Sequence, residues 1–201
     1  MTPFPPDPRS ARDWVRILAA YREPDTTRSI YELGVTLVGF IALWIAAWFA
    51  LDVSWLLTVA VGIVNGGFIV RLFAIQHDCG HGSFFSNRHL SDWTSRILGV
   101  VTLTPYDVWR RTHALHHSHA GNLDRRGIGD VHTLTLLEYR ALSPLLAFSY
   151  RLYRHPLVMF GLGPTYLFFL QNRLPLGLMR AGRVYWVSAM ATNLAIVVAL
   201  T

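Results

Sequence analysis

The fold is decided by an apolar stretch that is interrupted once: LGVTLVGFIALWIAAWFAL (33–51), then DVS (52–54), then WLLTVAVGIVNGGFIVRLFAI (55–75). The first run carries no charge and, as a helix, is long enough to cross about 30 Å of hydrocarbon. The three residues between the runs allow only a very short connection, so the second run must return antiparallel to the first. The stretch therefore predicts a transmembrane helical hairpin.

The charges around the hairpin predict its orientation. Five arginines precede residue 33, which places the N-terminus in the cytoplasm by the positive-inside rule and returns the second span to the same side. Arg71 lies near the end of that span, where its long side chain is expected to extend to the headgroups. Asn65-Gly66-Gly67 lies in mid-span and is expected to pack closely against a neighbouring helix.

Residues 1–30 are predicted to be a cytoplasmic tail with an interfacial helix. Residues 2–8 hold four prolines and are expected to be irregular. The pair Ser10 and Asp13 then has the spacing of a capping box. The residues that follow form an apolar face between arginines, as in helices that lie in the membrane interface: Trp14, Ile17, Leu18 and Tyr21. Ser29 with Glu32 repeats the helix-start signal.

The composition favours a membrane protein over a soluble one. Hydrophobic residues make up 52% of the 201 residues, with seven Trp and eight Tyr. The net charge of +6 comes from arginines that bracket apolar runs, which argues against nucleic-acid binding and for contact with anionic headgroups. The single cysteine, Cys79, excludes an internal disulfide and a cysteine-based zinc ribbon and is expected to be a small packed residue. We find no secretory signal.

The rest of the chain is predicted to contain one further span. Residues 97–103 are apolar but too short to cross, so they are expected to be re-entrant or interfacial. Residues 121–130 are polar and glycine-rich, as in a cytoplasmic loop. Residues 155–170 are apolar but interrupted by prolines and glycines, and a span there would place three following arginines outside; we expect interfacial helices instead. The third span is predicted at 185–201.

Two histidine clusters stand beside these apolar runs: His77-Asp78-Cys79-Gly80-His81 and His113-Ala114-Leu115-His116-His117. Spacings of three and four residues place all the imidazoles of a cluster on one helical face. Imidazole suits iron, zinc and copper, and two such faces opposed in a helical bundle can hold a metal site. If the second span continues as a helix, the first cluster lies at the cytoplasmic interface.

The residues around the clusters resemble a known family. QHDCGHGSFF (76–85) and WRRTHALHHSHAGNLDRRGIGD (109–130) resemble the membrane fatty-acid desaturases, in particular the bacterial acyl-lipid delta-12 (omega-6) type, and the likeness covers roughly residues 31–201. The family implies a non-haem di-iron centre on the cytoplasmic face of four transmembrane helices. It also implies O2, electrons from a soluble donor (ferredoxin or cytochrome b5) and a membrane lipid whose acyl chain receives a double bond. The implied location is a bacterial inner membrane.

By this resemblance the iron ligands are His77, His81, His113, His116 and His117, with Asp78, Gly80 and Gly82 in supporting positions. The family's third histidine box, which follows a fourth span, is absent. We therefore expect residues 31–201 to be an incomplete desaturase-like domain with spans at about 33–51, 55–75 and 185–201. We expect an N-terminal fragment that binds metal poorly and is inactive alone. The remaining histidines are expected not to be ligands: His89, His119, His132 and His155.

The predicted fold is all-α: a multi-pass membrane protein with a transmembrane hairpin, cytoplasmic or interfacial helices that carry the histidine boxes, and a third span cut short at the C-terminus. Two other functions remain open on the sequence. One is a related histidine-box hydroxylase or ketolase acting on alkanes, sterols or carotenoids. The other is a non-catalytic membrane protein that binds metal or acts as a scaffold.

Overall fold

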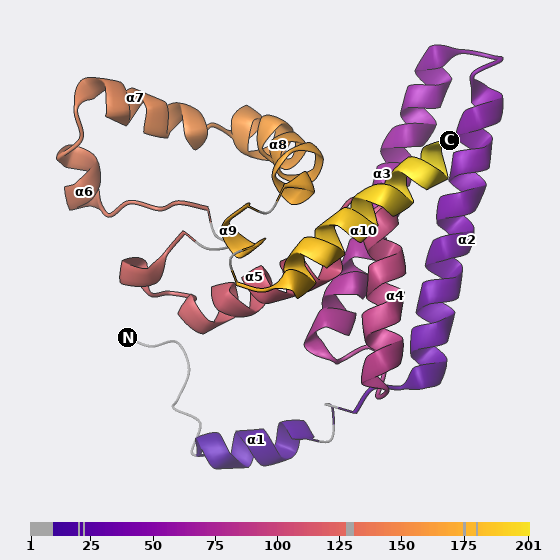
Figure 1. Cartoon of the computed structure of the whole chain (residues 1–201), viewed down its shortest axis with the longest axis horizontal. Coiled ribbons are helices and arrows are strands. Elements are labelled where there is room, and N and C mark those ends of the chain that lie inside the picture. Colours follow the sequence, from indigo (N-terminus) through magenta and orange to yellow (C-terminus); the bar gives the residue numbers. More distant parts are fainter. Residues whose placement is uncertain (1–9, 20, 22, 128–130, 175, 180) are drawn as a thin grey trace, which may run out of the picture. The chain divides into compact units, whose positions relative to one another are not determined.

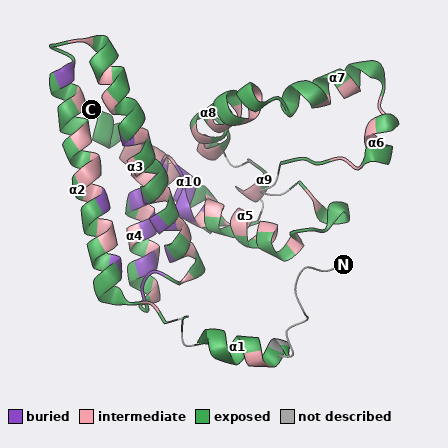
Figure 2. Ribbon diagram, turned by 180° about the vertical axis from the view of Figure 1, so that it is seen from behind, coloured by how far each residue is buried: buried purple, intermediate pink, exposed green. Residues whose placement is uncertain are grey.

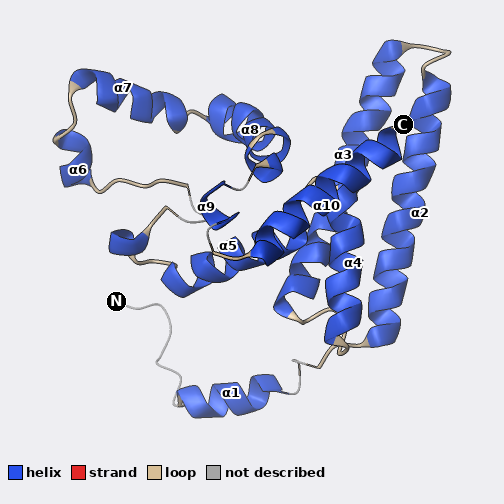
Figure 3. Ribbon diagram, in the orientation of Figure 1, coloured by secondary structure: helices blue, strands red, loops and turns tan. Residues whose placement is uncertain are grey.

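Helices joined by loops make up the described part of the chain, with no strand among its residues, as the all-α prediction expects (Figure 3). A computed structural model describes residues 10–19, 21, 23–127, 131–174, 176–179 and 181–201. The predictions for residues 2–8 and for 128–130 of the polar loop lie outside the described residues. The helices are α1 (Ala11–Ala19), α2 (Thr26–Ala50), α3 (Trp55–His81), α4 (Arg88–Val101), α5 (Tyr106–His119), α6 (Leu136–Arg140), α7 (Pro144–Tyr153), α8 (Gly163–Phe169), α9 (Leu176–Met179) and α10 (Arg183–Leu200).

Three of these helices are long and apolar enough to cross a membrane: α2, α3 and α10. Their positions agree with the three predicted spans, except that α2 begins before residue 33 and α3 continues past residue 75 to His81. Both hairpin helices are exposed along most of their length (Figure 2). In water such surfaces would be unfavourable, whereas hydrocarbon accepts them without cost.

The chain divides into two compact units, residues 1–95 and 96–201. In the first unit, α2 and α3 run side by side and are joined by the short turn that begins at Asp52 (Figure 1). The α2 helix begins earlier than the predicted signal at Ser29. The carboxylate of Asp25 accepts hydrogen bonds from the backbone N–H groups of Thr27 (2.9 Å) and Arg28 (3.1 Å), so it caps the helix one turn before Ser29.

Helix α1 begins as predicted. The backbone N–H and hydroxyl of Ser10 both bond to the Asp13 carboxylate, at 3.0 and 2.6 Å, which completes the expected cap and lowers the pKa of Asp13. Trp14, Ile17 and Leu18 are exposed on this short helix. Tyr21, which was predicted on the same face, lies beyond the last helical residue.

Two features inside the hairpin add to or differ from the prediction. The guanidinium of Arg71 pairs with Glu32 of α2, a contact that was not predicted. The two glycines of the Asn65-Gly66-Gly67 segment make no close helix contact among the described residues, so the prediction is wrong for them. A Cβ atom on Gly66 or Gly67 would meet nothing within 4 Å, whereas one on Gly39 would lie 2.2 Å from the Cε1 atom of Phe68.

The second unit places α5 against α10. The predicted apolar piece at 97–103 is the last part of the continuous helix α4 and the turn that follows it. Residues 142–170 form α7, a π-helical segment η2 (Val158–Leu162) and α8, none of which is long enough to be a candidate span. The third span, α10, contacts α5, α9 and the short 3₁₀ turn η3 (Gln171–Arg173).

Candidate metal centre

The first histidine pair lies at the end of the second span. His77 and His81 are one turn apart in α3, and their Nε2 atoms are 3.2 Å from each other. The ring of His77 is half-buried and that of His81 is exposed. The i, i+4 spacing therefore brings the two imidazoles together as predicted. Between them, Cys79 turns away and is buried.

The chain after His81 explains why the helix ends there. Gly82 has a φ of +75°, a left-handed conformation that glycine adopts without steric cost, and the backbone N–H of Ser83 donates to the carbonyl of Asp78 (3.0 Å). The guanidinium of Arg88 donates to the carbonyls of Cys79 and Gly80, at 3.3 Å each. These bonds satisfy the last carbonyls of α3 and hold the histidine end in place.

Asp78 supports the first pair directly. Its Oδ1 atom lies 3.1 Å from Nδ1 of His77. When Nδ1–H donates to this carboxylate, the proton is held on Nδ1 and the lone pair of Nε2 faces His81. The aspartate thus selects the tautomer that a metal-binding imidazole needs.

The second group lies on the last turns of α5. The Nε2 atoms of His113 and His117 are 3.0 Å apart. The ring of His116 lies 6.0 Å from that of His113 and 5.5 Å from that of His117, measured between centroids. Trp109 stacks on His113 at 4.7 Å, which fixes the orientation of that ring. All three imidazoles therefore share one face, as predicted.

The start of α5 is anchored by charge and burial. Arg96 forms two hydrogen bonds, of 3.2 and 3.0 Å, with the carboxylate of Asp107 in the first helical turn. The backbone N–H of Asp107 donates to the hydroxyl of Ser188 in α10 (3.2 Å). Tyr106 beside it is almost completely buried. These contacts tie the histidine-bearing helix to the third span.

Each histidine pair fits a transition-metal ion. With metal–nitrogen bonds of about 2.1 Å, two ligands at right angles lie about 3.0 Å apart. The observed Nε2 separations of 3.2 and 3.0 Å match that requirement. One member of each pair, His81 in α3 and His117 in α5, also lies in the last turn of its helix, where the helix dipole favours a cation. Each pair can supply two adjacent imidazole ligands.

The remaining histidines lie apart from these pairs. His89 and His132 are exposed. Nδ1 of His155 accepts the backbone N–H of Leu157 at 3.3 Å. His119 is the last residue of α5, and its Nδ1 is buried without a hydrogen-bond partner among the described residues.

Sequence reasoning missed the polar cluster of Glu32, Thr36 and Arg71, which joins the two hairpin helices. A signal was present. Glu32 is the only acidic residue of α2, and it lies 20 residues before Asp52, the first residue of the turn, while Arg71 lies 17 residues after Ser54, the last. In an antiparallel hairpin those distances place both charges at a similar depth.

These features define an all-helical, multi-pass membrane protein with histidine-bearing helices suited to metal binding. Comparison with known proteins makes the class specific. A family model described as Fatty acid desaturase matches residues 53–201, most of the chain. The chain therefore belongs to the fatty acid desaturase family, which confirms the resemblance inferred from the histidine clusters.

Individual relatives agree with this assignment. The chain is 44% identical over 180 residues to a fatty acid desaturase of Bacillus subtilis, an alignment that covers 90% of this chain and 51% of the relative. It is 36% identical over 107 residues to an sn-1 acyl-lipid omega-3 desaturase (ferredoxin) of Synechocystis sp., covering 51% and 28%. It is 33% identical over 98 residues to an sn-1 oleoyl-lipid 12-desaturase of Anabaena variabilis, covering 49% and 26%.

The chain spans about half the length of its Bacillus relative and about a quarter of the two cyanobacterial relatives. No solved structure matches it.

Proposed function

We propose that this chain serves the oxygen-dependent desaturation of acyl chains in membrane lipids, and that His77, His81, His113, His116 and His117 are ligands of a non-haem di-iron centre. The observation that carries the proposal is the pairing of Nε2 atoms at 3.2 Å in α3 and 3.0 Å in α5, within a member of the desaturase family. Five neutral imidazoles and no thiolate form a donor set suited to iron.

The chemistry requires a bound oxidant. An unactivated methylene C–H bond is beyond any side-chain acid or base, so the reactivity belongs to the cofactor. When bound, the iron centre supplies the activation of O2: one O2, two electrons and two protons, with the two hydrogens taken from adjacent methylenes, yield a double bond and two molecules of water.

The chain's own residues hold and orient this centre. Asp78 keeps the proton of His77 on Nδ1, and Trp109 fixes the ring of His113 by stacking. Arg88 and Gly82 hold the end of α3, while Arg96 holds the start of α5 through Asp107. Such supporting contacts raise metal affinity because the ligands lose less freedom on binding.

Topology and electron supply are part of the proposal. The five arginines before the hairpin favour a cytoplasmic position for the histidine end of α3, in a bacterial inner membrane. A site at that interface is accessible to a soluble electron donor, ferredoxin or cytochrome b5. The printed name of the Synechocystis relative includes ferredoxin, which favours a donor of that type.

Product analysis tests the proposal. The complete reading frame that contains this sequence is expressed in a bacterial host under oxygen, with iron, and the membrane lipids are analysed by gas chromatography and mass spectrometry. We expect a new unsaturated fatty acid that is lost in His116→Ala and retained in the matched variant His89→Ala. No new unsaturation, despite membrane-inserted protein, would overturn the proposal.

The same analysis separates the two other candidate functions. A hydroxylated or keto product would assign the chain to the hydroxylase or ketolase type and overturn the desaturase assignment. An unchanged lipid profile, together with iron that co-purifies with the wild type and not with His116→Ala, would instead support a non-catalytic metal-binding protein.

A further inference from the structure

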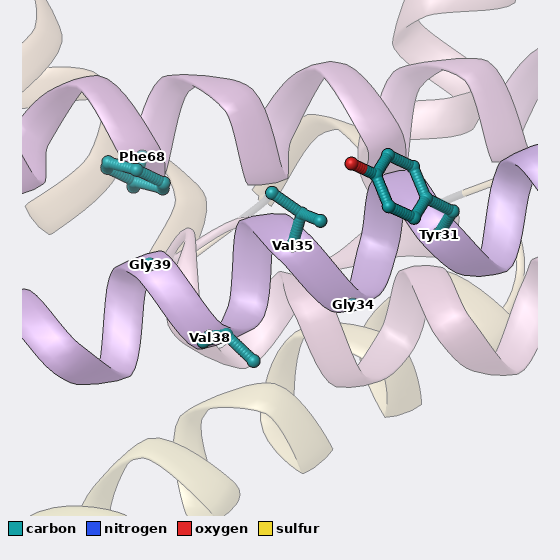
Figure 4. A pocket seen from close by; sticks show the side chains of 6 residues that line it. All are labelled: Tyr31, Gly34, Val35, Val38, Gly39 and Phe68. Atoms are coloured by element: carbon teal, nitrogen blue, oxygen red, sulfur yellow. The ribbon is translucent and has the colours of Figure 1, made fainter.

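An apolar groove lies on the surface of the hairpin formed by α2 and α3. It is lined by Tyr31, Gly34, Val35, Val38, Gly39 and Phe68, and its volume is about 520 Å³. Figure 4 shows Tyr31 and Phe68 at opposite ends, with Val35 between them. The lining is almost wholly apolar, which suits an apolar ligand or a second apolar surface.

The two glycines create the groove. Gly39 lets the Phe68 ring lie directly against the backbone of α2, since a Cβ atom there would be 2.2 Å from Cε1 of Phe68. A Cβ atom on Gly34 would meet nothing within 4 Å. The space over Gly34 is therefore open, and a side chain added there would enter the groove without displacing another.

The groove has the depth of an acyl chain in one leaflet. From Tyr31 to Gly39 the helix rises about 12 Å at 1.5 Å per residue, and half of the hydrocarbon core is about 15 Å thick. Both helices are candidate membrane spans, so the surface faces hydrocarbon. An extended acyl chain fits this depth.

One end of the groove is polar and cationic. The hydroxyl of Tyr31 is the polar group of the lining and points along the groove toward Val35 (Figure 4). Arg28 lies on the same face of α2 three residues earlier, and its side chain is exposed. A tyrosine hydroxyl can donate to an ester carbonyl, and the guanidinium can bind a phosphate. From the apolar lining to the Tyr31 hydroxyl and then to Arg28, the groups follow the order of acyl chain, ester and phosphate in a glycerophospholipid.

We propose that this groove binds an anionic glycerophospholipid. One acyl chain lies over Gly34 and against Phe68, the ester carbonyl accepts the Tyr31 hydroxyl, and the headgroup phosphate pairs with Arg28. Glu32 is already paired with Arg71. The carboxylate of Asp25, the acid nearest to Arg28 in the sequence, accepts hydrogen bonds from the backbone N–H groups of Thr27 and Arg28 at the start of α2. The proposal concerns lipid binding alone and does not rest on the reaction that the histidine helices support.

Lipid titration of the purified full chain tests the proposal. The chain is titrated in detergent with phosphatidylglycerol or phosphatidylcholine, and bound lipid is counted by native mass spectrometry. Gly34→Leu fills the groove, and Gly62→Leu, at an exposed position of α3 that is equally open, is the matched control. We expect Gly34→Leu to weaken phosphatidylglycerol binding at least fivefold and Gly62→Leu to leave it unchanged. Circular dichroism checks that both variants keep their helix content.

A second experiment tests the role of the Arg28 charge in the preference for an anionic lipid. Arg28→Gln should abolish the preference for phosphatidylglycerol over phosphatidylcholine, while Arg151→Gln, at an exposed position of α7, should preserve it. Equal lipid binding by Gly34→Leu and Gly62→Leu would overturn the proposal. So would efficient disulfide-linked dimers of Val38→Cys in membranes, in a Cys79→Ser background, because a second copy would then cover the groove.

Discussion

The guanidinium of Arg71 in α3 forms an ion pair with the carboxylate of Glu32 in α2. Its Nε atom also donates a hydrogen bond of 2.8 Å to the hydroxyl of Thr36, which is completely buried and itself donates to the backbone carbonyl of Glu32 at 2.6 Å. One turn earlier, the hydroxyl of Ser29 donates to the carbonyl of Phe84, just after the histidine end of α3. These contacts fix the register of the hairpin and, with it, the height of His77 and His81.

Glu32→Gln should destabilise the hairpin. The substitution leaves Arg71 without an anionic partner inside an apolar span, where an unpaired arginine costs several kcal/mol. Both side chains are partly exposed, so we expect a loss of about 1–2 kcal/mol and a fall in the apparent Tm of about 3–6 °C. Thermal unfolding in detergent, monitored by circular dichroism, measures this fall in the apparent Tm.

The double variant Glu32→Leu/Arg71→Leu is the informative control. Replacing both members of an ion pair with apolar residues leaves no unpaired charge and is often neutral or stabilising. The double variant should therefore unfold at or above the wild-type temperature. A double variant less stable than Glu32→Gln would mean that the pair contributes net attraction, and would contradict the explanation by unpaired charge.

The sequence predicts most of the hairpin and both histidine faces, because these depend on local rules. Apolar length predicts a span, and the spacing of His77 with His81 brings their rings together in any helix. The start of α2 was misplaced because Asp25, a single capping residue, competes with the equally plausible signal at Ser29. Such choices depend on which side chain reaches the backbone N–H groups.

Contacts between distant residues were the part that the sequence could not predict. The bond from Arg96 to Asp107 and the seating of the Phe68 ring against Gly39 depend on how helices pack, which no spacing rule encodes. The same holds for Arg173, whose guanidinium donates to the carbonyl of Leu103, 70 residues earlier. The set of iron ligands stays a prediction from the resemblance.

Asp78→Asn should weaken metal binding while leaving the fold intact. An amide can present its NH2 group to Nδ1 of His77, and it then no longer fixes the proton on Nδ1. Loss of such a supporting carboxylate typically costs 10–100-fold in metal affinity. Titration of the purified chain with Co²⁺, followed by its visible absorption, measures the change. Asp52→Asn, in the exposed hairpin turn, is the control. Equal affinities in the two variants would exclude Asp78 as a support for the ligand.

Arg173→Met should destabilise the second unit. Leu103 has a φ of +55°, a left-handed conformation that costs a leucine about 1–2 kcal/mol. Its carbonyl accepts hydrogen bonds from Arg173 and from Asn172 (3.4 Å), and Arg173 also bonds to the amide oxygen of Asn193 in α10 (2.9 Å). Burial disfavours the charged form and lowers the pKa of Arg173, and the two acceptors, the Leu103 carbonyl and the Asn193 amide oxygen, offset part of this cost.

Because the turn at Leu103 precedes α5, its loss should also loosen the second histidine group. We expect a fall in stability of about 1–2 kcal/mol for Arg173→Met, from the loss of hydrogen bonds by a charged donor. Arg183→Met, at the exposed start of α10, should change stability by less than about 0.5 kcal/mol. Chemical unfolding in mixed micelles compares the two variants, and equal losses would contradict a specific role for Arg173.

Glu138 should make the α6 segment sensitive to acid. Its carboxylate pairs with Arg126 and accepts hydrogen bonds from the backbone N–H (2.7 Å) and the hydroxyl (2.8 Å) of Thr135, whose hydroxyl in turn accepts the backbone N–H of Glu138. The bond from Arg126 is the largest cause that lowers the pKa of Glu138 to about 2, followed by the two bonds from Thr135. The folded pKa thus lies below that of the unfolded chain.

Because the pKa of Glu138 is lower in the folded chain than in the unfolded chain, acid reduces the stability that this carboxylate contributes. A carboxylate whose pKa is depressed by folding stabilises the folded state fully above its unfolded pKa, near 4.3, and loses this contribution as the pH falls toward its folded value. The difference in apparent Tm between wild type and Glu138→Gln should therefore be largest at pH 6–7, shrink below pH 4.5 and nearly vanish at pH 2. Arg126→Gln should reduce this pH dependence, because it removes the main cause of the low pKa. A difference that stays constant from pH 7 to pH 2 would contradict the role of the Glu138 charge.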